Sequence, residues 1–345
     1  MKPFALLILG IFPLIGGCYL LKQGTYLFGY STRSQPIDKV LAEGSADADA
    51  EAMLRTVQQI RRYATEELGL KQNRNYTRYV ELDKDYIVDV VTACRADSFS
   101  PHLWRFPIFG TFPYKGYYER ADAEREAARL EKRGLDVWIG RVDGFSTLGL
   151  LSDPIYSFMA DYSLYALADL IIHEQTHATI FIKNEIQFNE ELATFVGREG
   201  ALSFLRDRYG TDSAAYNQAL AALKDGKVFR CRILDLHDQL ERIYSLDAER
   251  ETTLAEKLRT VEEFNRRLIA EAPQLFQTDR FRAFGGIPAN NAYIMSFVRY
   301  HQDLDLFYRL YEANGRDLPS TVGVLKQLEN ANIPPKQALK ELIGE

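Results

Sequence analysis

The spacing of apolar residues along the first half of the chain predicts one helix, followed by a region of strands with a second helix among them. Between residues 46 and 69 apolar positions recur every three or four residues, which is typical of an amphipathic helix. Residues 76–93 alternate and are rich in Tyr and Val, so they predict strands. Residues 101–118 predict a twisted hairpin or packed loop, 121–133 a charged surface helix, and 135–142 another strand.

After residue 200 the pattern is helical. Residues 213–270 are rich in Ala, Leu, Arg and Glu and contain no Pro, which predicts a long helical hairpin with a charged surface. Residues 290–345 are helical again, with breaks at Gly315 and Pro319. The expected fold class is therefore α+β, with an α/β part at 46–160 and a helical part at 161–345.

The N-terminus resembles a secretion signal. Lys2 precedes an apolar run from Phe4 to Ile15, and the small residues Gly16 and Gly17 precede Cys18, as in a bacterial lipobox. We expect residues 1–17 to be a signal peptide, Cys18 to carry lipid, and residues 18–45 to form a tether. Because the apolar stretch extends to Leu21, an uncleaved signal anchor is the alternative. Either form would hold the body at the cell envelope, facing the periplasm or the exterior.

Composition narrows the function classes. The chain has 345 residues, 46% hydrophobic and 26% charged, with a net charge of −6, so it is globular and offers no basic surface for nucleic acid. Three cysteines are too few for a disulfide scaffold. Cys94 and Cys231 could pair in an oxidising compartment or remain as two buried thiols.

A metal-binding pattern lies in an apolar helical segment. His173, Glu174 and His177 form H-E-x-x-H, which puts both imidazoles on one helix face, where they can bind one zinc ion. Glu174 can then hold water at the metal and take its proton as general base. The alternative is two incidental histidines, but the chain has only five, and buried ionisable groups need a partner or a metal.

A hydrolytic zinc site needs a third protein ligand. Asn189-Glu190-Glu191-Leu192-Ala193 begins twelve residues after His177, and a short turn can bring a second helix back across the first. Glu190 is the expected ligand, and Glu185 and Glu191 are the alternatives. Glu185 lies in the turn, and Glu191 points about 100° away from Glu190.

The combination of H-E-x-x-H with N-E-x-x-A resembles the gluzincin metallopeptidases, and the wider sequence resembles the predicted zinc aminopeptidases of the bacterial envelope. Besides the lipobox, the resemblance rests on stretches at residues 104–118, 144–154, 188–200 and 290–301. The chain departs from the family pattern at Arg105 and Thr111, where Cys is frequent, and at Leu150, where an aromatic residue is frequent.

The resemblance implies a zincin-like fold, one zinc ion and a peptide substrate. It also implies a Tyr or His that stabilises the oxyanion, for which Tyr300 and His301 are the candidates. Aminopeptidase activity rests on the resemblance alone, so an endopeptidase is one rival. A non-catalytic binding protein with a structural zinc is another, although such a site would not need Glu174.

Overall fold

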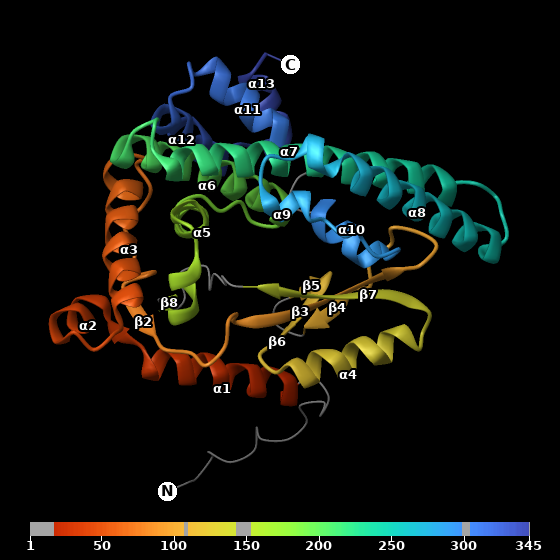
Figure 1. Cartoon of the computed structure of the whole chain (residues 1–345), viewed down its shortest axis with the longest axis horizontal. Helices are drawn as coiled ribbons and strands as arrows, with labels where there is room; N and C mark the ends of the chain where they lie inside the picture. The colour runs from red at the N-terminus through yellow and green to blue at the C-terminus, as the bar shows by residue number, and fades with distance from the viewer. Residues whose placement is uncertain (1–16, 107–109, 143–152, 299–303, 345) are drawn as a thin grey trace, which may run out of the picture.

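The computed structural model describes residues 17–106, 110–142, 153–298 and 304–344. Helices dominate, and small sheets are confined to the first half of the chain (Figure 1). The α+β class expected from the sequence is therefore confirmed.

The strands form two three-stranded sheets and a hairpin, in the orders β1-β2-β8, β6-β3-β7 and β4-β5. In the second sheet β3 and β7 pair antiparallel from Val88 opposite Val142 to Arg95 opposite Leu135. In the first sheet β2 and β8 pair in parallel. The strands are β1 (Gln35–Pro36), β2 (Arg78–Val80), β3 (Val88–Arg95), β4 (Trp104–Phe106), β5 (Gly110–Phe112), β6 (Tyr114–Tyr117), β7 (Leu135–Val142) and β8 (Ile155–Tyr156).

Helices flank both sheets. The sheet formed by β6, β3 and β7 lies between α4 and α10 (Figure 1). The α-helices are α1 (Gly17–Arg33), α2 (Ile37–Glu43), α3 (Ala48–Glu66), α4 (Arg120–Glu131), α5 (Leu164–His177), α6 (Ile186–Tyr209), α7 (Ala214–Tyr244), α8 (Arg250–Leu275), α9 (Asp279–Arg282), α10 (Asn291–Val298), α11 (Leu304–Ala313), α12 (Leu318–Gln327) and α13 (Pro335–Leu342). Short 3₁₀ helices span Ser157–Asp161 and Leu328–Asn330.

The segment expected as a tether is helical and lies against the body. Tyr19, Tyr26 and Tyr30 recur on one face of α1, and the ring of Tyr26 stacks on that of Tyr118 with 5.3 Å between centroids. In α2, Ile37 and Val40 are buried in the main core. The sequence pattern missed α1 because spaced aromatic residues, not a long aliphatic stripe, make its contacts, and it missed α2 because that helix has only seven residues. The expected signal peptide lies outside the described residues except for Gly17, which begins α1.

No helix in the described part of the chain is long and apolar enough to cross a membrane.

The core is built around the pair α5 and α6. Leu167, Ala168, Ile171 and Ile172 of α5 are buried, as the apolar run predicts. The two helices approach closely because α6 carries Gly197 at their crossing, where a Cβ would lie 3.0 Å from the backbone oxygen of Asp169. The structure thus locks together the two helices that carry the metal-binding pattern.

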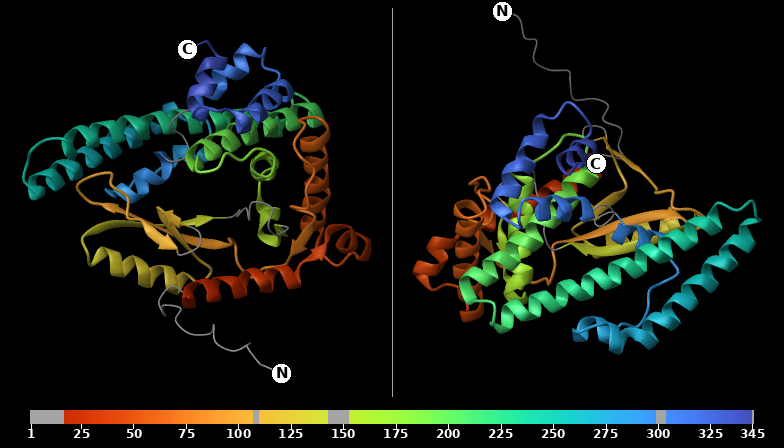
Figure 2. Two further views of the ribbon diagram at one scale, coloured as in Figure 1. Left: turned by 180° about the vertical axis from the view of Figure 1, so that it is seen from behind. Right: turned by 90° about the horizontal axis from the view of Figure 1, so that it is seen from above.

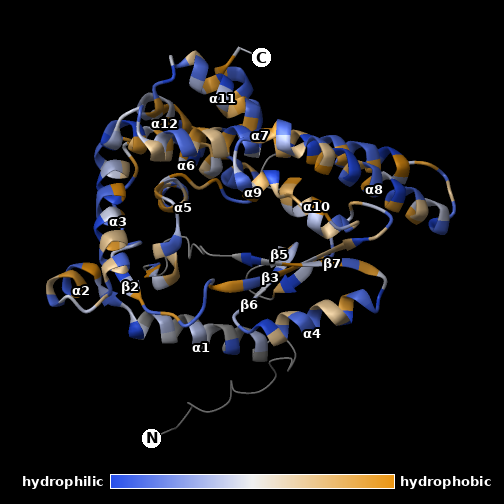
Figure 3. Cartoon of the chain, viewed as in Figure 1, coloured by the Kyte–Doolittle hydropathy of each residue, from blue (hydrophilic) through white to orange (hydrophobic). Residues whose placement is uncertain are grey.

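The long hairpin predicted for residues 213–270 is confirmed as α7 and α8, which run antiparallel beside each other (Figure 2). Hydrophilic residues are interspersed along both helices (Figure 3), while Phe229, Ile233 and Val261 contribute to a separate hydrophobic cluster. Gly315 does end a helical segment, but Pro319 lies in the first turn of α12 and begins it rather than breaking it.

Candidate active site

The two histidines of the H-E-x-x-H pattern lie in the last turns of α5, as predicted. Ser163 begins this helix by accepting a hydrogen bond from the backbone N–H of Ala166. One turn apart, the rings of His173 and His177 lie edge-on to each other, and their Nε2 atoms are 3.1 Å apart. Two imidazoles this close need either a shared proton or a shared cation.

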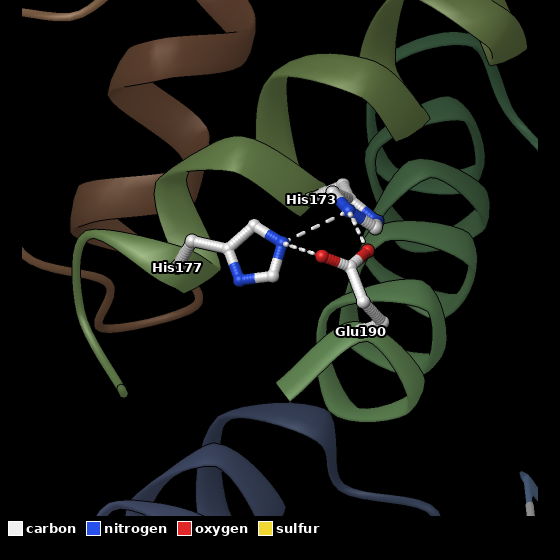
Figure 4. A group of neighbouring side chains, drawn as sticks. All are labelled: His173, His177 and Glu190. Atoms are coloured by element: carbon white, nitrogen blue, oxygen red, sulfur yellow. Dashed lines mark hydrogen bonds and ion pairs between the residues drawn. The ribbon is translucent and has the colours of Figure 1, made fainter. Parts of the chain in front are cut away.

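Glu190 of α6 completes the group. Its Oε2 lies 3.6 Å from Nε2 of His173, and its Oε1 lies 3.6 Å from Nε2 of His177. Figure 4 shows the three side chains pointing toward one another from the two helices. We call these three residues the metal-binding group, because their nitrogen and oxygen atoms lie within 4.8 Å of one another and could hold one metal ion. Of the three glutamates considered from the sequence, Glu190 is thus the one beside the imidazoles.

The turn between the helices is held by a residue whose role the sequence did not reveal. Asn189 is buried, and its side chain accepts from the N–H of Ile182 and donates to the oxygen of the same residue, at 2.9 and 2.8 Å. Asn184 takes a positive φ of 67° in the turn, a conformation that Asn tolerates well. These two residues direct α6 back across α5, so that Glu190 reaches the histidines.

The donor set fits a zinc ion. Tetrahedral zinc with nitrogen and oxygen ligands at about 2.0–2.2 Å places those ligand atoms about 3.3–3.5 Å from one another. The observed separations of 3.1, 3.6 and 3.6 Å bracket that value. Two imidazoles and one carboxylate are also a known catalytic set that leaves one position open.

The two imidazoles differ in their affinity for protons. Burial lowers the pKa of His173, but the carboxylates of Glu190 and Glu174 outweigh that effect and raise the pKa above its usual value. Burial and the neighbouring His173 lower the pKa of His177 to about 4. His177 therefore presents a neutral nitrogen near pH 7, the form that binds a metal.

Glu174 is buried next to this group, and 8% of its surface is exposed. A second buried residue, Tyr76, lies within its electrostatic reach: burial and then the charge of Glu174 raise the pKa of the Tyr76 phenol well above its usual value. Among the described residues no group hydrogen-bonds the Tyr76 hydroxyl. Tyr76 also has a positive φ of 56°, which is rare for a bulky side chain. No sequence pattern marked this residue.

Asp169 lies one turn before His173 on the same face of α5. Burial raises the pKa of its carboxyl, while Arg198 and His173 act in the opposite direction. Because Gly197 has no side chain, the carboxylate fits between the two helices: a Cβ there would lie 2.5 Å from Asp169 Oδ1. The spacing of four residues before the first histidine could have indicated Asp169 from the sequence.

The other candidates are placed differently. Glu191 is fully buried, accepts from Nε2 of Gln187 at 3.0 Å and lies 3.6 Å from Nζ of Lys336. Glu185 immediately precedes α6 and is not part of the metal-binding group. Tyr300 and His301 lie outside the described residues.

The remaining histidines and cysteines behave largely as structural residues. His102 packs edge-on against Trp104, and His237 stacks on Phe99 with 4.2 Å between ring centroids. His237 also lies near two acidic side chains of α7, but those are exposed. Cys94 is buried and Cys231 exposed, and both are free thiols, so neither the disulfide nor a pair of buried thiols is correct.

Comparison with known proteins identifies the family of the chain. A family model described as "Putative aminopeptidase" matches residues 18–339, which include every residue of the metal-binding group. The chain belongs to this family. No curated protein and no solved structure matches it. The description of this family implies a peptide substrate.

Proposed function

We propose that the protein is a zinc-dependent aminopeptidase with His173, His177 and Glu190 as the ligands of one zinc ion and Glu174 as the general base. The observation that carries the proposal is the convergence of two imidazoles and one carboxylate, all within 4.8 Å, beside a further buried carboxylate. The family description supplies the class of reaction.

A bound zinc ion would supply a Lewis acid that polarises a peptide carbonyl and brings the pKa of water near 7. The protein's own part is to hold and move protons. Glu174 accepts a proton from the attacking water and then donates it to the leaving amine, which avoids expelling an amide anion. Burial of Glu174 keeps its carboxylate away from bulk water during both transfers. His177 stays neutral and so remains a ligand.

Metal content distinguishes the ligands from their neighbours. We expect one zinc per chain, lost or strongly weakened in His177→Ala and Glu190→Gln. The matched control is Glu191→Gln, since Glu191 is adjacent in sequence but faces Gln187 and Lys336. Glu174→Gln should retain zinc and lose hydrolysis by about 10²–10⁴-fold. Zinc binding that survives His177→Ala would refute the assignment.

Exopeptidase and endopeptidase activity are separated by a pair of peptides that differ in N-acetylation. An aminopeptidase gains binding energy from the free ammonium, about 1.5–3 kcal/mol for a charge-assisted bond, or roughly ten- to a hundredfold. The carboxylate that binds the ammonium must be accessible, which rules out the fully buried Glu191. We expect the acetylated peptide to be cleaved at least tenfold more slowly. Equal cleavage at an internal bond would instead establish an endopeptidase.

We further propose that the protein is a lipoprotein of the cell envelope, because Gly16-Gly17-Cys18 follows an apolar run. Mass spectrometry of the membrane fraction should find a lipidated N-terminal Cys18, and Cys18→Ser should abolish the modification. A membrane-bound product that retains residues 1–17 would establish the signal anchor. A soluble unlipidated product would refute both forms of attachment.

A further inference from the structure

A cavity of about 150 Å³ lies between β3, α10 and the first turn of α6. Its walls include Ala93 on β3, Ala292, Met295 and Val298 on α10, and Gln187 in the first turn of α6. In Figure 1 the start of α6, α10 and β3 surround the middle of the molecule. No sequence motif pointed to this cavity, because its walls are distant along the chain.

The lining is mainly apolar. Ala292, Met295 and Val298 follow one another at three-residue steps, so they form one stripe along α10. Pro101 and Pro113 add rigid apolar groups to the lining. None of the residues that line the cavity carries a charge. The side-chain nitrogen of Gln187 donates to Glu191, so this amide group is already engaged.

The cavity and the metal-binding group share α6. Gln187 and Glu190 are three residues apart on this helix, which brings their Cβ atoms to about 5–6 Å of each other. Glu190 lies 3.6 Å from both imidazoles. If the scissile carbonyl of a peptide lies at the two histidines, the side chain of an adjacent peptide residue can therefore reach the cavity.

We infer that this cavity is the subsite for the side chain of a residue flanking the scissile bond, and that it selects leucine-, methionine- or phenylalanine-sized apolar side chains. The inference rests on the proposed peptidase function and specifies its substrate class. A cavity of about 150 Å³ lined by apolar groups is large enough for a benzene-sized group. Aspartate or lysine is disfavoured, because its charge would be buried without a partner.

Two substitutions change the cavity in opposite directions. Ala292→Leu adds volume at a buried wall and should shift preference toward alanine and glycine. Met295→Ala removes volume and should shift preference toward larger aromatic side chains. Ala283→Leu is the matched control, because Ala283 is exposed on the segment before α10 and does not line the cavity. Zinc content should be unchanged in all three proteins, which shows that the metal-binding group is intact.

The test uses tripeptides X-Gly-Gly and Gly-X-Gly, with X as Gly, Ala, Leu, Phe, Asp or Lys. Hydrolysis is measured with the zinc-loaded protein, and binding is measured by calorimetry with the Glu174→Gln variant, which needs no turnover. In one of the two series we expect leucine to exceed alanine by at least about tenfold, as for apolar pockets in general. That preference should fall severalfold in Ala292→Leu and stay unchanged in Ala283→Leu.

The possible outcomes distinguish the subsite proposal from the peptidase proposal. If the peptides are bound or cleaved without preference at either position, the subsite is refuted and the peptidase stands. A preference for leucine that both cavity variants leave unchanged also refutes the subsite. If no tripeptide is bound or cleaved by zinc-loaded protein, the peptidase proposal fails and the subsite fails with it.

Discussion

Replacing Gly197 with alanine would insert one methyl group at the crossing of α5 and α6. The added Cβ would lie 2.5 Å from Oδ1 of Asp169, 3.0 Å from its backbone oxygen and 3.1 Å from Cβ of His173. The carboxylate can rotate away, but the other two atoms belong to the body of α5. Restoring an ordinary separation of 3.4 Å requires the helices to move apart by 3.4 − 3.0 = 0.4 Å.

Two effects of opposite sign decide the change in stability. Alanine favours a helix over glycine by about 1 kcal/mol, whereas overpacking a well-filled core costs about 1–3 kcal/mol. Because rigid atoms contribute two of the three close contacts, we place Gly197→Ala in the upper half of that range. The expected net loss is about 1–2 kcal/mol. Zinc affinity should fall as well, since Glu190 lies two turns before Gly197 on the face toward α5.

The assay is urea unfolding followed by far-UV circular dichroism, together with zinc competition against a chelator. Gly226→Ala is the matched control, because Gly226 is inside α7 and a Cβ there meets nothing within 4 Å. It should raise the free energy of unfolding by about 0.5–1 kcal/mol and leave zinc affinity unchanged. The reasoning is refuted if Gly197→Ala is stabilised like the control and binds zinc as tightly as the wild type.

Two further substitutions and one labelling reaction test the buried polar groups and the cysteines. Lys336→Ala should lower the free energy of unfolding by about 1–3 kcal/mol in urea titration, because it removes a cation beside the fully buried carboxylate of Glu191; an unchanged midpoint would contradict this. Tyr76→Phe should be neutral or stabilising by up to about 1 kcal/mol, since no described residue hydrogen-bonds the buried hydroxyl, and a clear loss would reveal a missing partner. A thiol reagent should label the exposed Cys231 in the native protein. Cys94 should be labelled only on unfolding, because it is buried and burial raises the pKa of its thiol to about 12. Peptide mapping of the labelled protein measures both.

The sequence predicted those parts of the fold that depend on local patterns. The strand over Leu135–Val142 and the helix over Ala48–Glu66 lie where residue spacing placed them, because each buries one regular face. The pairing of β2 with β8 could not be predicted, since it joins strands separated by another sheet in the chain. Helix α1 was missed because its contacts are made by three spaced tyrosines.

In the candidate site, too, local patterns predicted some residues, whereas residues placed by tertiary contacts were missed. The placement of His173 and His177 follows from helical periodicity, and that of Glu190 from a short turn between helices. Tyr76 could not be predicted, because its position depends on a left-handed backbone and on tertiary packing against α5. The exposure of Cys231 was also missed, since a cysteine on a long helix can face either way.

The packing of α6 against the C-terminal helices determines when the candidate site can assemble. Phe188 and Phe195, on either side of Glu190, both pack on Phe307 of α11, with ring centroids 5.3 and 5.8 Å apart. The cation beside Glu191 comes from Lys336 of α13, the last helix in the chain. A chain that is still being synthesised lacks these partners, so α6 has no complete surface to pack on. His173, His177 and Glu190 therefore gain their supporting contacts only after α11 and α13 have been synthesised.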